Sequence, residues 1–106
     1  MSDWYLHLNW DDEAHQNFYQ HYRKADRQEQ ELALLHQAEL LSKHLDNTTL
    51  KAAESLLILW MSQHFNQGNA AQVYELMQAI CSRIGDHDRA KDFKEKLDKI
   101  NASLKR

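Results

Sequence analysis

The chain has 106 residues, a net charge of −3 and one cysteine, which together suit a single domain whose core is stable without disulfides. A negative net charge argues against a dedicated nucleic-acid binder, because such binding depends on Lys and Arg contacts to phosphates. No apolar leader is visible and no apolar run is long enough to cross a bilayer, so we expect a cytoplasmic protein with no membrane partner.

Turn-forming residues are scarce in this sequence. It contains no proline and only two glycines, Gly68 and Gly85. A sheet with many tight turns needs more of these residues, whereas helices joined by short connections do not. We therefore predict an all-α fold, with four or five antiparallel helices in a small bundle that spans residues 11–106 as one domain.

The first ten residues follow a different pattern from the rest. Large apolar residues occupy every second position: Trp4, Leu6, Leu8 and Trp10. A period of two is typical of an extended segment, so residues 1–10 are predicted to be an extended aromatic arm that lies across the helices. Because aromatic side chains are common interface anchors, the candidate protein-binding residues are Trp4, Tyr5 and Trp10. They either cover their own domain or dock on a partner or a second copy.

Two helical stripes come next along the chain. The first consists of Ala14, Phe18, Tyr22 and Ala25, and the second consists of Leu34, Ala38, Leu41 and Leu45. Their phases do not match, which predicts a break near residues 25–30. Asp26, followed by Glu29 three residues later, has the pattern of a helix N-cap.

The third predicted helix begins after a group of capping residues at 46–49. The run 56–61 is apolar around most of the helix circumference, which is typical of a helix in the centre of a fold. We therefore expect Leu57 and Trp60 to be buried.

Two further helices are predicted at the C-terminus. Asn69 is a candidate N-cap for a helix over residues 70–84, which Gly85 ends. Asp86 is a candidate cap for the last helix. Its apolar stripe consists of Ala90, Phe93, Leu97, Ile100 and Leu104.

The sequence carries no recognisable motif for catalysis or metal binding. The seven histidines are never four residues apart, so no helix carries a two-histidine zinc clamp. Cys81 adjoins an apolar helix face, where a cysteine usually behaves as a small core residue. The chain also lacks glycine-rich phosphate loops and nucleophile motifs. We predict no catalytic residues, no metal, no cofactor and no enzymatic activity.

Residues 71–104 resemble a single tetratricopeptide repeat. Tyr74 and Met77 occupy positions where that pattern has large residues, residues 84–86 match its turn, and Ala90 matches a small residue of its second helix. Shifting the pattern back by its period of about 34 residues gives no second copy. The resemblance implies a helical hairpin, and it implies binding of peptides or proteins, which is what most of that family does.

The absence of catalytic and metal-binding motifs, together with the aromatic arm, favours one function. We expect a non-enzymatic protein-interaction domain that acts as an adaptor, a chaperone-like protein or a regulatory subunit, with a protein or peptide partner and a possible homodimer. The alternative is a small acidic inhibitor or immunity-type protein that blocks a partner enzyme, because residues 1–85 hold eleven acids and six bases.

Overall fold

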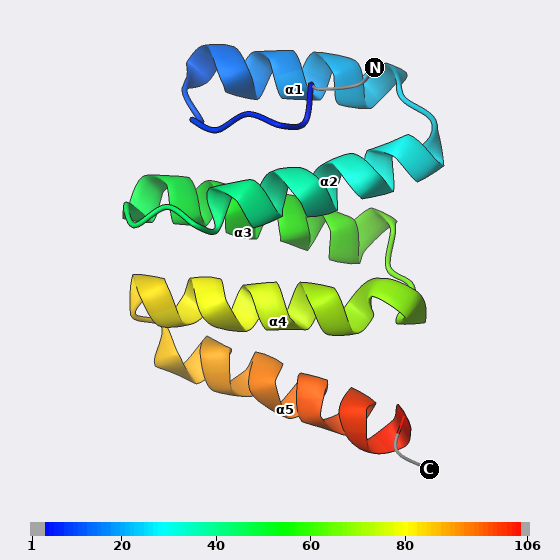
Figure 1. The fold of residues 1–106 in the computed structure, drawn as a ribbon, viewed down its shortest axis with the longest axis vertical. Coiled ribbons are helices and arrows are strands. Elements are labelled where there is room, and N and C mark those ends of the chain that lie inside the picture. The colour runs from blue at the N-terminus through cyan, green and yellow to red at the C-terminus, as the bar shows by residue number, and fades with distance from the viewer. Residues whose placement is uncertain (1–3, 105–106) are drawn as a thin grey trace.

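A computed structural model of the protein describes residues 4–104, which form five helices. These are α1 (Asp12–Lys24), α2 (Arg27–Leu41), α3 (Asn47–Gln63), α4 (Gln67–Ile84) and α5 (His87–Leu104). Successive helices run in opposite directions and are stacked along the 42 Å long axis, with α1 and α5 at the two ends (Figure 1). The predicted all-α fold is confirmed, and no strand occurs within residues 4–104. The first three arm residues and the last two domain residues lie outside the described range.

Side-chain caps set where the helices begin. The carboxylates of Asp11, Asp26 and Asp46 each accept a hydrogen bond of 2.8–2.9 Å from the backbone N–H three residues on, and Asp86 accepts one of 3.3 Å from Arg89. Such caps satisfy N–H groups that have no partner inside the helix. The predicted break is confirmed, since Ala25 is extended between α1 and α2.

The predicted start of α4 is wrong by three residues. Asn66, not Asn69, is the N-cap, because its side chain accepts a 2.9 Å hydrogen bond from the Asn69 backbone N–H. Gly68 therefore lies inside the first turn. The side-chain amides of Asn66 and Asn69 both donate to Glu31 of α2 at 2.6 Å. This double contact holds the start of α4 against α2.

The core is centred on α3, as its apolar sequence predicts. Leu57 and Trp60 are fully buried, and α3 packs between α2 and α4. The expected place of Leu45 in the second apolar stripe is wrong, because this residue is 88% exposed. Helix α2 ends at Leu41, so the helical period does not continue as far as Leu45.

Helices α4 and α5 form the predicted C-terminal hairpin. Gly85 ends α4 with a positive φ of 88°, a conformation that glycine adopts without the steric cost of a side chain. Ala90 and Phe93 then bury the inner face of α5.

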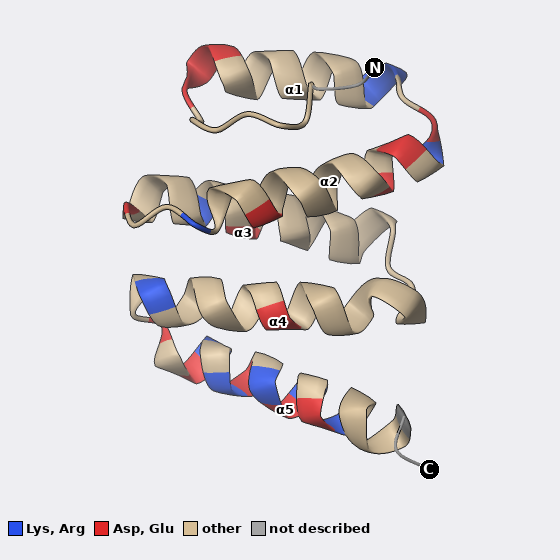
Figure 2. Cartoon of the chain, in the orientation of Figure 1, with Lys and Arg blue, Asp and Glu red and all other residues tan. Residues whose placement is uncertain are grey.

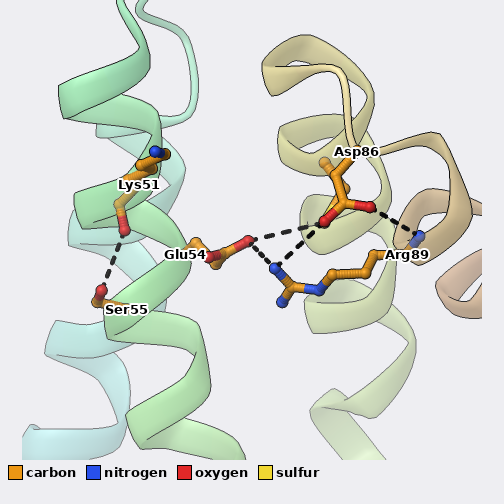
Figure 3. Close-up of polar contacts among 6 residues, drawn as sticks. Lys51, Glu54, Ser55, Asp86 and Arg89 are labelled. Atoms are coloured by element: carbon orange, nitrogen blue, oxygen red, sulfur yellow. Dashed lines mark hydrogen bonds and ion pairs between the residues drawn. The ribbon is translucent and has the colours of Figure 1, made fainter.

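An ion pair between α3 and α5 holds this hairpin against the rest of the fold. The Arg89 side chain reaches from α5 toward Glu54 on α3, with Asp86 beside it (Figure 3), and the Arg89 Nη1 to Glu54 Oε2 distance is 2.7 Å.

Candidate protein-binding face

The arm, of which residues 4–10 are described, lies between α1 and α2 (Figure 1). Trp4 anchors it: this side chain is 8% exposed, and its ring centroid lies 5.2 Å from that of Phe18 and 5.7 Å from that of His21, both on α1. The large indole surface removed from water stabilises this docked position. The arm is therefore packed on its own domain.

A buried glutamine fixes the backbone of the arm. Gln37 on α2 is fully buried, and its amide donates to the His7 carbonyl at 2.8 Å while accepting from the His7 backbone N–H at 2.9 Å. Both polar ends of the buried amide are thereby satisfied. Gln37 is not among the predicted site residues, although a polar side chain beside Leu34 and Ala38 in an apolar stripe indicates a buried polar contact of this kind.

Two further contacts tie the arm to both neighbouring helices. The His7 ring Nε2 lies 3.2 Å from Asn17 Oδ1 on α1. The carbonyl of Leu8 lies within hydrogen-bond distance of the His44 ring, just after α2. The arm is thus held at several points along its length.

The three predicted site residues all face their own domain to some degree. Trp4 is buried, whereas Tyr5 and Trp10 are half-buried. The Tyr5 ring lies 6.0 Å from that of His36, and the Trp10 ring lies 5.5 Å from that of Phe18. The structure therefore brings these aromatic residues to one part of the molecule, and their part in binding a partner stays a prediction.

The apolar side chains that the arm does expose are leucines. Leu6 is 45% exposed and Leu8 is 68% exposed. A strict alternation would have placed them on the same face as Trp4 and Trp10. That expectation is wrong, because the arm turns at residues 4–5 and bends at residues 8–9, and each change of direction breaks the period of two.

A cleft of about 490 Å³ separates these leucines from the start of α1. Leu6 and Leu8 line it from the arm, and Asp11, Glu13 and Asn17 line it from the other side, with no Lys or Arg in the lining. In Figure 2 the start of α1 is coloured as acidic and its end as basic. We use the name arm face for Leu6, Leu8 and residues 11–13.

Two other clefts carry charges of both signs. One of about 400 Å³ lies between α1 and α3 and contains both Asp12 and Lys51. Another of about 340 Å³ lies between α2 and α4, and acidic and basic side chains alternate in its lining. A further cleft of about 330 Å³ is also lined by acids and an exposed leucine, namely Asp26, Glu29 and Leu32, with no Lys or Arg. The arm face differs from it in presenting two exposed leucines rather than one.

The buried polar groups elsewhere connect helices to one another. His64 at the end of α3 contacts the Tyr22 hydroxyl of α1, with its Nε2 at 2.8 Å. Burial lowers the pKa of His64 and raises that of Tyr22, so both are neutral at pH 7. Cys81 is fully buried, as predicted, and burial raises the pKa of its thiol, which disfavours the nucleophilic thiolate.

Neither metal-ligand clusters nor membrane-spanning helices were found in the described part of the chain. No group of three or more His, Cys, Asp or Glu side chains within residues 4–104 is placed to hold a metal ion. None of the described helices has the length and apolar character needed to cross a bilayer.

Comparison with protein families, curated proteins and solved structures found no match to this chain. The resemblance of residues 71–104 to a tetratricopeptide repeat therefore stays a prediction.

Proposed function

We propose that this chain is a non-enzymatic protein-interaction domain, of the adaptor, chaperone-like or regulatory type, and that it binds a protein or peptide through the arm face in the cytoplasm. The observation that carries the proposal is the exposure of Leu6 and Leu8 on an arm that is otherwise fixed. Neighbouring exposed apolar side chains mark interaction sites on many proteins.

The fixed position of the arm strengthens this interpretation. A loose tail would have to lose conformational freedom when it bound a partner, and that loss weakens affinity. Here the Trp4 anchor and the Gln37 hydrogen bonds order the backbone beforehand. Leu6 and Leu8 are thus presented in a set geometry, which favours binding.

The acidic start of α1 favours a second candidate function. A small inhibitor that blocks a basic active site would use such a surface, because opposite charges steer association. The dependence on salt separates the two. An electrostatic inhibitor loses association rate steeply as salt rises, whereas binding dominated by Leu6 and Leu8 does not.

The proposal is tested by affinity capture with three versions of the tagged chain. The Leu6→Ser/Leu8→Ser double variant removes the exposed leucines, and Ile58→Ser is the control, because Ile58 is also 45% exposed but lies on α3. We expect a protein that is captured by the wild type and by the control and is lost from the double variant. A partner that the double variant still captures would place the interface elsewhere.

A further inference from the structure

The acidic part of the arm face carries charge that its surroundings do not neutralise. Asp11, Asp12 and Glu13 are all exposed, and none forms an ion pair within residues 4–104. Asp11 accepts the capping hydrogen bond of Ala14 at 2.8 Å. The positive end of the helix dipole stabilises these carboxylates, but it leaves their charge exposed. Asp11 and Glu13 line the cleft beside the arm, whereas Asp12 lines the neighbouring cleft between α1 and α3.

Basic side chains lie away from the cleft between the arm and α1. The Lys and Arg residues of α1 are in its last turn, at the opposite end from these acids. Lys51 lines the other cleft, between α1 and α3, which Asp11 and Asp12 also line, but it forms no ion pair with either. A ligand that enters beside Leu6 and Leu8 therefore meets carboxylates and no cationic side chain.

The chemistry of this surface selects among classes of partner. A purely apolar segment would cover the carboxylates and remove them from water without compensation, which is costly. An acidic segment or an anionic lipid surface would be repelled. A segment with apolar residues on one side and Lys or Arg beside them can pack on the two leucines of the arm face and pair with its carboxylates.

We infer that the partner presents a basic amphipathic segment, whose apolar side chains pack on Leu6 and Leu8 and whose cationic side chains pair with the acids at 11–13. This inference rests on the proposed function and specifies the chemistry of its partner. Pairs of this kind, at a partly covered interface, raise the association rate and select the partner by charge.

The first test uses a defined probe. A fluorescently labelled helical peptide of leucine and lysine, roughly 14 residues or four turns long, is titrated with the full chain and followed by anisotropy. A matched peptide with glutamate in place of lysine is the control. Binding of the lysine peptide alone is expected, with weaker affinity at high salt. The inference is overturned if the lysine peptide does not bind or if both peptides bind equally.

Two charge variants locate the binding. Asp11→Asn/Asp12→Asn/Glu13→Gln neutralises the arm face and keeps a capping side chain at position 11, since Asn caps as well as Asp. The control Asp92→Asn/Glu95→Gln/Asp98→Asn removes the same three charges from exposed positions of α5. The arm-face variant should bind the lysine peptide about tenfold more weakly, and the control should bind like the wild type. Equal weakening in both would show attraction to net charge only, which overturns the inference.

A leucine variant separates failure of the inference from failure of the proposed function. If Leu6→Ser/Leu8→Ser abolishes capture of the cellular partner while neutralisation of residues 11–13 leaves it intact, the arm face binds a partner that is not basic. If neither variant affects capture, the proposed function fails as well. Circular dichroism of each variant establishes that its helices are folded.

Discussion

At the scale of single residues, Trp60 is the side chain on which stability depends most. It is fully buried in α3, with its ring 5.6 Å from that of Phe65. Trp60→Ala leaves a large cavity and should lower the free energy of unfolding by roughly 3–5 kcal/mol, which is a large part of the stability of a domain this size. Chemical denaturation monitored by circular dichroism measures it.

A conservative variant at the same position tests the reason for this effect. The Trp60 Nε1 is buried and has no hydrogen-bond partner among the described residues. Trp60→Phe keeps most of the ring and removes that unpaired donor, so its cost should stay below about 2 kcal/mol. Similar losses for the Ala and Phe variants would contradict this expectation, because they would show that a phenyl ring does not replace the packing of the indole.

His64 gives the fold a dependence on pH whose sign follows from burial. Burial lowers the pKa of this side chain, Arg27 lowers it further, and Glu31 opposes the shift. The folded state therefore favours the neutral ring, and the unfolded state takes up a proton first as pH falls. The contribution of His64 is fully present above the ordinary histidine pKa of about 6.5 and is lost as pH falls toward the folded-state pKa.

Thermal unfolding at pH 7.5 and pH 5.5 tests this dependence. We expect the wild-type Tm to be lower at pH 5.5 than at pH 7.5. The difference in Tm between the two pH values should be smaller for His64→Gln. His87→Gln is the control, because His87 is exposed at the start of α5. A His64→Gln protein with the same pH dependence as the wild type would assign the effect to other groups, since Tyr22, Arg27 and Glu31 also face this ring.

At the scale of helices, the sequence predicts most boundaries because local chemistry sets them. Asp26, Asp46 and Asp86 each cap the helix that follows, and a cap acts within three residues of itself. The start of α4 could not be predicted in the same way. Asn66 and Asn69 are both good caps, and the contact of both amides with Glu31 depends on how α4 packs against α2.

In the arm, too, the sequence predicts only those features of the candidate site that do not depend on contacts with distant residues. Its aromatic content and its lack of helical period are visible in the sequence, and Trp4 is a buried anchor. Which side chains it exposes depends on a turn at residues 4–5 and a bend at residues 8–9. Between them the backbone of His7 is hydrogen-bonded to Gln37, which is 30 residues away along the chain. Periodicity within ten residues carries no information about such a contact, so Leu6 and Leu8 were not singled out.

At the scale of the whole molecule, charge is distributed unevenly along the stack of helices. Acidic and basic residues alternate closely along α5, whereas α1 is acidic at its start and basic at its end (Figure 2). Interleaved charges of both signs largely cancel beyond a Debye length of about 10 Å. The start of α1 is not compensated in this way, so this end of the molecule should dominate long-range attraction to a basic partner.

Because the arm is docked on the helices, its removal should affect the stability of the whole chain. Deletion of residues 1–10 removes the buried Trp4 side chain and both hydrogen bonds to Gln37. Burial of one large apolar side chain contributes roughly 1.5–3 kcal/mol, and each 1 kcal/mol shifts Tm by roughly 4–8 °C in a domain this size. The truncated chain should therefore unfold at least about 6 °C lower than the full chain and keep its helical circular dichroism.

Light scattering on the same truncated chain measures its oligomeric state and so tests whether the arm packs on its own chain or on a second copy. Because the arm packs within its own chain, we expect the oligomeric state to be the same with and without it. Leu6→Ser/Leu8→Ser is the control, since it alters exposed residues only and should leave Tm within about 2 °C of the wild type. If truncation converts a dimer to a monomer while Tm of the helices is unchanged, the arm belongs to an interface between two copies. In that case Trp4 would be buried by the second chain.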